Sequence, residues 1–304
     1  MKIKKNQLDS KHCGPIVDSV DGYDVIECRQ CKFKHLDPIP ADEKLAKMYA
    51  DEFYKTKKSH YLKDAEEDSV WWMETYKNYF RLPEKHAEGK RLLDIGSGPG
   101  YFIKCGQDMG WDVLGFEPST RAAEYSSKLG VKVVNSFFDV TKANQYGKFD
   151  VVCLNLVLEH IPDPVKFLQD VKVVLKPNGL IFVLSPNEYN PLQRVLCENL
   201  FFKPWWVSPP QHINYFDFKS IKKLLESLNF AIIDSTSTYP MEFFLLGGDN
   251  YVGKRGVGRK CHLKRKTLET NLFVHNPDLI NAFYRDLAKN NIGREFVIVG
   301  KRND

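Results

Sequence analysis

The sequence predicts an α/β fold in which helices cover both faces of a mostly parallel β-sheet. The first observation is a strand–loop–helix signal at residues 91–103, where the apolar run Leu92–Ile95 is followed by a glycine-rich turn and by Tyr101–Ile103. The second is that strand and helix signals go on alternating to about residue 235, which is typical of repeated βαβ units. The third is an apolar run at residues 293–302 that fits a last strand.

Composition sets the broad class of the protein. A chain of 304 residues with 43% hydrophobic and 27% charged residues is typical of one large or two modest globular domains. No apolar stretch reaches the length of a membrane span, and the first twelve residues lack the apolar core of a signal peptide, so we expect a cytoplasmic protein. Seven cysteines do not suggest a disulfide scaffold. A net charge of +5 permits an anionic substrate without requiring nucleic acid.

The glycine-rich turn indicates a cofactor site. Gly96, Gly98 and Gly100 let the backbone turn tightly and leave no side chains between it and a ligand, and the following helix points its first N–H groups at that place. The dinucleotide fingerprint spaces its glycines as G-x-G-x-x-G. Here the third glycine comes one position early, and Asp94 lies two residues before the first glycine.

The run LLDIGSGPG resembles motif I of the class I S-adenosylmethionine (SAM) methyltransferases, and this resemblance implies a Rossmann-like seven-stranded sheet that binds SAM. On this interpretation the Asp94 carboxylate receives the ammonium of the methionine part. The alternative is a tight βα turn in some other α/β fold. The loop residues expected to contact the cofactor are Gly96, Ser97, Gly98, Gly100, Tyr101 and Phe102.

A second acid supports the same interpretation. Glu117, followed by Pro118, ends the next predicted strand at residues 112–118, where a carboxylate can take both ribose hydroxyls of a nucleoside. The plain alternative is a surface acid at a strand end. After a third predicted strand at 131–138, Phe137 could pack on the adenine, although the sequence does not fix that contact. Asn155 ends the next strand, where many relatives carry Asp or Ser.

The segment after Asn155 extends the resemblance. VLEHIPDP resembles the equivalent segment of ubiquinone-biosynthesis-type and sugar methyltransferases, and LKPNGLIFVLSPN resembles the helix, turn and fifth strand that follow it. The resemblance covers residues 91–235. His160 in this segment could act as a base, hold the local turn or approach the cofactor from the side.

Residues 187–218 are interpreted as an insertion that forms a wall of the acceptor pocket, because they are rich in proline and aromatic residues and ligands bind at the carboxyl ends of such strands. The stretch PPQHINYF resembles the H-x-x-Y-F stretch of sugar C- and O-methyltransferases. Methylation of a hydroxyl or an acidic C–H needs a base that titrates near neutrality. His212 is therefore the leading catalytic candidate, and anchoring of the insertion is its alternative role. Gln211 stands where some relatives have Glu, which weakens a paired-base mechanism.

The first forty residues resemble a zinc knuckle. Cys28 and Cys31 form a C-x2-C pair, His35 follows four residues later and Cys13 lies upstream. Because tetrahedral zinc takes thiolate and imidazole ligands, these four residues could hold a structural zinc ion, and His12 could replace His35. The alternative is a degenerate knuckle that is held by packing alone.

The remaining segments complete the predicted organisation. Residues 41–88 are predicted to be a helical lid or linker in which most aromatic residues belong to the core, while Trp72 and Tyr76 are candidates for contact with a ligand. Residues 89–304 form the predicted methyltransferase domain, with a second insertion at 239–293. The cationic run in that insertion could bind the phosphates of a nucleotide-linked sugar, or RNA, or could be a solvated helix start. It comprises Lys254, Arg255, Arg259, Lys260, Lys264, Arg265 and Lys266.

Together these observations predict a SAM-dependent methyltransferase that acts on a small molecule. The acceptor is expected to be a sugar or nucleotide-linked sugar of surface polysaccharide biosynthesis, an expectation that rests on resemblance alone. One alternative is a ribosomal-RNA methyltransferase with an N-terminal zinc module, although no N-P-P-Y-type motif follows the fourth strand. The other is a non-catalytic SAM-binding module that recognises a partner. The methylated atom and the oligomeric state are left open.

Overall fold

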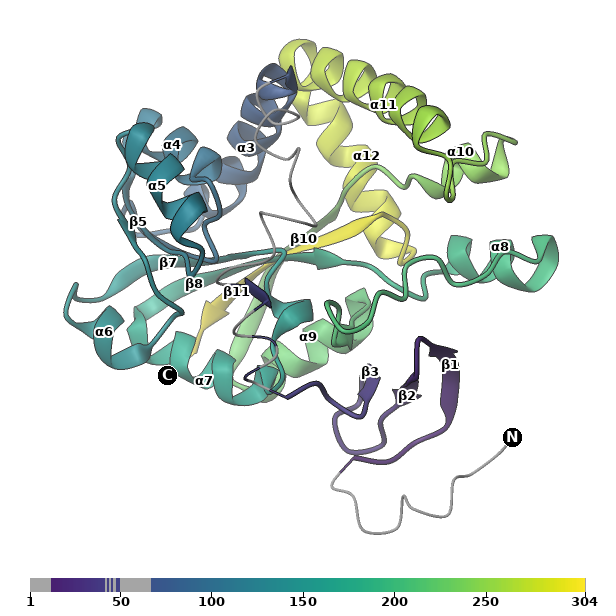
Figure 1. Ribbon diagram of the computed structural model, residues 1–304. Coiled ribbons are helices and arrows are strands. Elements are labelled where there is room, and N and C mark those ends of the chain that lie inside the picture. The colour runs from purple at the N-terminus through teal and green to yellow at the C-terminus, as the bar shows by residue number, and fades with distance from the viewer. Residues whose placement is uncertain (1–11, 42, 44, 46–47, 50–66, 304) are drawn as a thin grey trace.

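The computed structural model describes residues 12–41, 43, 45, 48–49 and 67–303 (Figure 1). Much of the predicted 41–88 lid therefore lies outside the described residues. The longest described part of it is the helix α3 (Ser69–Glu84).

Seven strands form the central sheet, in the order β10-β11-β8-β7-β4-β5-β6. The strands β4 to β8 run parallel, whereas β11 is antiparallel to both of its neighbours. The α/β fold with a seven-stranded, mostly parallel sheet is confirmed. The strand bounds are β4 (Arg91–Ile95), β5 (Asp112–Phe116), β6 (Val133–Val134), β7 (Phe149–Asn155), β8 (Leu175–Pro186), β10 (Phe230–Ser237) and β11 (Glu295–Arg302).

Helices lie on both faces of this sheet (Figure 1). Besides α3, the helices of the described ranges are α4 (Tyr101–Asp108), α5 (Thr120–Lys128), α6 (Val140–Asn144), the short 3-10 helix η3 (Leu158–His160), α7 (Pro164–Val174), α8 (Pro191–Leu200), α9 (Phe218–Ser227), α10 (Glu242–Leu246), α11 (Arg255–His275) and α12 (Pro277–Lys289). None of the helices in the described ranges is both long enough and apolar enough to cross a membrane.

The alternation of side chains along the strands produces two cores. In β4, Leu93 packs into the core that α6, α7 and α9 cover, while Leu92 packs on the opposite face with α3 and α4. The same alternation separates Val152 from Val151 in β7, because successive residues of a strand point to opposite faces. Because both faces of the sheet are buried, the sequences of these strands are continuous apolar runs.

The third parallel strand is shorter than the sequence predicts. The expected strand at 131–138 is reduced to the two residues of β6. Immediately after it, the Asn135 side chain donates hydrogen bonds to the carbonyl oxygens of Glu117 and Pro118, at 2.9 and 3.2 Å. These hydrogen bonds attach the segment after β6 to the end of β5, so the strand does not continue. They also bring Phe137 toward the same edge of the sheet.

A separate four-stranded antiparallel sheet lies at the N-terminus (Figure 1). It consists of β1 (Ile16–Val20), β2 (Tyr23–Glu27), β3 (Lys34–Asp37) and β9 (Asn214–Tyr215). The last strand comes from the 187–218 segment and pairs His35 with Asn214. The strands β2 and β3 flank the Cys28–Cys31 pair. The pairing with β9 attaches the N-terminal module to the chain two residues after His212.

Candidate functional site

A cavity of about 1000 Å³ lies at the carboxyl ends of the parallel strands. Its walls come from the glycine loop, the ends of β5 and β7, the helix α3, and both of the segments interpreted as insertions. This is the sheet edge at which open α/β folds bind ligands. The volume is at the upper end for a single-ligand pocket, about 300–1,000 Å³, so it has room for a cofactor and a small second molecule.

The glycine loop follows β4 and is fixed against β5. The backbone N–H groups of Gly96 and Ser97 donate to the carbonyl oxygen of Phe116, at 2.7 and 3.1 Å. Gly96 has a φ of 74°, and a Cβ added there would lie 2.7 Å from Cγ2 of Val157. Glycine is therefore required both by the left-handed backbone and by the close approach of the segment after β7.

Asp94 is the most buried acid facing the cavity. It is 1% exposed, and its Oδ1 has no hydrogen-bond partner among the described residues. Burial raises the pKa of Asp94 to about 8; the nearby Glu117 also raises it, while a hydrogen bond with Cys153 acts in the opposite direction. A buried carboxylate oxygen without a partner calls for a donor, and the ammonium of a SAM molecule fits that requirement.

Glu117 is oriented by the backbone around it. Its Oε2 accepts a hydrogen bond from the N–H of Gly98 and its Oε1 accepts one from the N–H of Ser119, both at 2.8 Å. Burial raises the pKa of Glu117 to about 7, and these two hydrogen bonds lower it. Each oxygen keeps a further lone pair, so the carboxylate can accept the two hydroxyls of a ribose without moving.

The other predicted cofactor residues mostly line the same cavity. Phe137, which is 46% exposed, lies at its rim. Gly100 does not line it; a Cβ there would lie 2.7 Å from Oγ of Ser126, so this glycine allows α4 and α5 to approach each other. The lining residues predicted from sequence are Asp94, Gly96, Ser97, Gly98, Tyr101, Phe102, Glu117, Pro118, Phe137 and Asn155.

The two candidate histidines come together on the other side of the cavity. The ring centroids of His160 and His212 are 5.2 Å apart, although one ring belongs to η3 and the other to the 187–218 segment. Nδ1 of His160 lies 2.7 Å from the carbonyl oxygen of Gln211, a contact that ties the two segments together. Glu159 completes a compact group whose polar atoms lie within 4.8 Å of one another.

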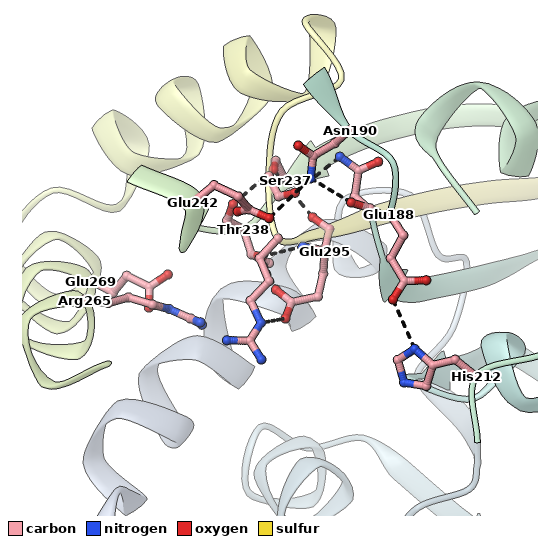
Figure 2. Close-up of polar contacts among 12 residues, drawn as sticks. Glu188, Asn190, His212, Ser237, Thr238, Glu242, Arg265, Glu269 and Glu295 are labelled. Atoms are coloured by element: carbon pink, nitrogen blue, oxygen red, sulfur yellow. Dashed lines mark hydrogen bonds and ion pairs between the residues drawn. The ribbon is translucent and has the colours of Figure 1, made fainter. Parts of the chain in front are cut away.

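His212 has a carboxylate partner that the sequence did not indicate. Its Nδ1 lies 3.1 Å from Oε1 of Glu188, and Figure 2 shows the ring directed at that side chain. Glu188 is 4% exposed; burial raises its pKa and His212 lowers it. In the sequence, Gln211 argues against a base paired with a neighbouring acid, because some relatives have Glu at that position. In the structure, Glu188 is the acid that pairs with His212. Its position two residues beyond the end of β8 was the signal that could have identified it.

Aromatic side chains form much of the remaining wall. Trp71, Trp72, Tyr76 and Tyr79 from α3 line the cavity. The Trp72 ring stacks on the Tyr76 ring at 5.2 Å, and Tyr76 packs in turn on Phe102 at 5.4 Å. These aromatics are therefore part of the core and of the cavity wall at once. Trp205 and Trp206 from the 187–218 segment also line the cavity.

The cationic run does not form one solvent-facing surface. Arg265 is buried, and its Nε donates to Oε2 of Glu269 at 2.9 Å. Other cations of the run pair with acids elsewhere in the chain: Lys264 with Asp249, Lys266 with Asp68 and Arg259 with Glu67. Arg265 lines the cavity, so this part of the run belongs to the interior.

The N-terminal module brings together a candidate metal site. The potential ligand atoms of His12, Cys28, Cys31 and His35 all lie within 4.8 Å of one another, and Cys13 is not part of this group. Nδ1 of His35 bonds to the carbonyl oxygen of Leu36, while its buried Nε2 has no hydrogen-bond partner in the described chain. The backbone N–H of Cys31 points at Sγ of Cys28, at 3.4 Å. Two thiolates and two imidazoles fit tetrahedral zinc.

Comparison with known proteins adds independent information. A family model described as a methyltransferase domain matches residues 73–235, just over half of the chain. The ubiquinone biosynthesis O-methyltransferase of Actinobacillus pleuropneumoniae serotype 7 is 28% identical over 120 residues, which are 36% of this chain and 51% of that protein. The enzyme of the same name from Paraburkholderia phymatum is 34% identical over 108 residues, 34% of this chain and 47% of that protein.

The matches to these curated relatives thus span about half of their length. Among solved structures, a chain from the complex of the Haloferax volcanii Trm112 methyltransferase activator with a methyltransferase aligns with a TM-score of 0.52 at 14% identity. That alignment covers 84% of this chain and 98% of the other, and it supports the fold alone.

Proposed function

The chain belongs to the methyltransferase domain family, and we propose that it is a SAM-dependent enzyme that methylates a small polar molecule. The observation that carries this proposal is the single cavity described above. One side of it matches the chemical groups of SAM, and the other side presents a histidine paired with a buried carboxylate.

On the cofactor side, the proposal assigns Asp94 to the cofactor ammonium and Glu117 to the ribose hydroxyls. The orphaned Oδ1 of Asp94 and the backbone-fixed carboxylate of Glu117 support these roles. When bound, SAM would supply a methyl group that is activated by its sulfonium. Gly96 lets the segment after β7 approach this loop closely, since a Cβ there would lie 2.7 Å from Cγ2 of Val157.

On the acceptor side, we assign proton removal to His212. Its Nδ1 is engaged by Glu188, which orients the ring, and we assign the uptake of the acceptor proton to Nε2. The buried Glu188 carboxylate also stabilises the imidazolium that results. His160, with Nδ1 at the Gln211 carbonyl, is assigned to hold the His212 segment in place. Positioning of this kind can lower the activation barrier by several kcal/mol. The upper limit indicated by effective molarities is roughly 7–11 kcal/mol.

We further propose that the acceptor is a sugar or a nucleotide-linked sugar, as in surface polysaccharide biosynthesis. The indoles of Trp205 and Trp206 and the polar side chains of Gln211 and Glu188 on this side of the cavity support it, because sugars offer both apolar faces and hydroxyls. The curated relatives are instead named for O-methylation in ubiquinone biosynthesis. The experiment below separates these acceptors from RNA and from one another.

The experiment uses methyl-labelled SAM with extract from the source organism, and compares the native enzyme with the His212→Ala variant. Small molecules, lipids, RNA and protein are separated after incubation. Label in polar small molecules with the native enzyme, and its loss with the variant, would support the proposal. Label in the lipid fraction would favour a quinone-type acceptor. Label in RNA or protein would contradict it, as would equal label with both enzymes.

We also propose that the N-terminal module binds one structural zinc ion through His12, Cys28, Cys31 and His35. The convergence of these ligands and the orphaned Nε2 of His35 support the proposal. Metal analysis of the purified protein should give one zinc per chain, and Cys31→Ser should lose it. Cys13→Ser is the matched control, because Cys13 lies outside the group. Loss of zinc from Cys13→Ser but not from Cys31→Ser would overturn the ligand assignment.

A further inference from the structure

A buried acid lies in the wall of the cavity beyond the His212–Glu188 pair. Glu242 begins α10, is 3% exposed and lines the cavity. Its Oε1 accepts hydrogen bonds from Nε2 of Gln193 at 3.0 Å and from Nδ2 of Asn190 at 3.5 Å. Its Oε2 has no hydrogen-bond partner among the described residues. Figure 2 shows Glu242, Asn190 and Glu188 in one polar region.

The position of Glu242 is fixed by its neighbours. Asn190 caps α8 through hydrogen bonds from the backbone N–H groups of Leu192 and Gln193, and the Gln193 side chain returns to the Asn190 N–H. Asn190 Nδ2 also donates to the carbonyl oxygen of Asn187, at 2.9 Å. Because a capping box of this kind holds both side chains in one geometry, the two amides present Glu242 in a single orientation.

The charges around Glu242 leave its carboxylate without a cation of its own. Arg265 pairs with Glu269 at 2.9 Å, and Arg294 pairs with Glu295 at 2.8 Å. Burial raises the pKa of Glu242, while its own backbone N–H, Gln193, Arg294 and Asn190 act the other way. The region therefore holds one more acid than base among these five side chains, so a ligand that donates a hydrogen bond or carries a positive charge is favoured.

The same cavity contains other buried polar atoms without partners. Glu188 Oε2 is a second orphaned acceptor, and Gln211 Nε2 and Trp206 Nε1 are orphaned donors, again within the described residues. All three side chains line the cavity. A buried polar group without a hydrogen-bond partner destabilises the protein, so four such atoms around one cavity indicate a ligand with several hydroxyls or amines.

From this geometry we propose that Glu242 is a specificity-determining residue, whose Oε2 accepts a hydrogen bond from a hydroxyl or ammonium group of the methyl acceptor. This inference rests on the proposed function and identifies the chemistry that the acceptor presents away from the methylated atom. It excludes a phosphate or carboxylate at this end of the acceptor, because like charges would meet. It also excludes an apolar tail, because such a tail would leave the buried carboxylate without a hydrogen-bond donor.

The test measures binding of four probes to the protein loaded with S-adenosylhomocysteine. D-glucosamine, D-glucose, D-glucose 6-phosphate and catechol are titrated by ligand-observed NMR. We expect glucosamine and glucose to bind at least tenfold more tightly than the other two. We also expect Glu242→Gln to weaken both sugars at least fivefold, with S-adenosylhomocysteine affinity unchanged. A larger loss for glucosamine than for glucose identifies an ammonium as the donor, and equal losses identify a hydroxyl.

Glu198→Gln is the matched control, because Glu198 lies on α8 with its side chain 63% exposed and should bind all probes as the native protein does. Glu242→Asp, which keeps the charge but shortens the reach, should also weaken the sugars. The proposal is overturned if neither sugar binds, if glucose 6-phosphate or catechol binds most tightly, or if the Glu242 variants keep native affinity for the sugars. Failure to bind S-adenosylhomocysteine would instead refute the proposed function.

Discussion

The two sides of the cavity are built in different ways. The cofactor side comes from one continuous stretch, residues 94–155, and depends on backbone groups: glycine φ angles, the N–H groups that hold Glu117, and the ends of adjacent parallel strands. The acceptor side is assembled from side chains of α3, the 187–218 segment and the region around α10 and α11. On the proposed function, the cofactor site is a property of the fold, whereas acceptor choice is assigned to the side chains of residues 187–218 and 239–293.

The largest effect should come from His212→Ala, which breaks the acceptor side alone. Loss of a general base typically costs about 10²–10⁴-fold in turnover, so kcat should fall by that range while S-adenosylhomocysteine affinity stays unchanged. Isothermal titration and methyl-transfer assays measure the two quantities. His160→Ala should cost less, because that ring is assigned to support. A parallel loss of cofactor affinity in His212→Ala would mean that the two sides are not separable.

Asp94→Asn tests the cofactor side in the same way. Replacement of the carboxylate removes a hydrogen bond to a charged group, worth about 1.5–3 kcal/mol, so S-adenosylhomocysteine should bind about 10–100-fold more weakly. Burial holds the pKa of Asp94 at about 8, and an ammonium pairs with the ionised form only. Affinity of the native protein should therefore rise from about pH 6 to 7.5, by up to about tenfold per pH unit.

The same pKa sets the sign of the effect on stability. Without cofactor, the folded protein keeps a proton on Asp94 that the unfolded chain loses near its ordinary pKa of 3.8. The contribution of this group to the free energy of unfolding should therefore decrease as the pH rises from about 4 to about 8. Asp94→Asn should flatten both the binding and the stability profile. Unchanged pH profiles in the variant would contradict this account of Asp94.

Glu188→Gln tests the role of the carboxylate that pairs with His212 on the acceptor side. The amide oxygen can still accept from Nδ1 of His212, but the charge that stabilises the imidazolium is lost, so we expect kcat to fall by about tenfold, or about 1.4 kcal/mol. Cofactor affinity should not change. The control is Glu226→Gln on α9, which does not line the cavity. Native turnover in Glu188→Gln would show that the pair seen in Figure 2 has no part in proton transfer.

The smallest effect on turnover should follow metal removal. Because β3 pairs with β9, just after His212, loss of zinc through Cys31→Ser should loosen residues 211–216 and lower kcat several-fold. Hydrogen exchange should accelerate at those residues and stay unchanged at residues 94–100. Equal acceleration at both places would show that the metal stabilises the whole protein and not the acceptor side in particular.

The sequence allowed the cofactor side to be predicted and left part of the acceptor side unresolved, for a physical reason. Asp94, the glycines and Glu117 follow each other on consecutive βα units, so local spacing places them at one sheet edge. Glu188, the partner of His212, and Glu242 gain their roles only through contacts between distant segments. The same holds for β9, whose pairing with β3 depends on a long-range contact.

The N-terminal module and the cationic run illustrate the same limit. Spacing identified Cys28, Cys31 and His35, but the sequence predicted Cys13 as the fourth ligand and His12 only as a replacement for His35. In the structure His12, and not Cys13, joins the other three residues. The run around Arg265 was interpreted as a charged surface. Glu269 lies four residues after Arg265, a spacing that the sequence offered as a helical ion pair, whereas Asp68, the partner of Lys266, is far away in the chain.

The most direct measurement of the central claim is a crystal structure of the protein with S-adenosylhomocysteine bound. The ribose hydroxyls should lie within hydrogen-bond distance of Glu117, and the amino group should contact Asp94. The sulfur should then face the part of the cavity where His212 and Glu188 lie. A cofactor bound with its sulfur directed away from His212, or bound outside this cavity, would contradict the account of one cavity with a cofactor side and an acceptor side.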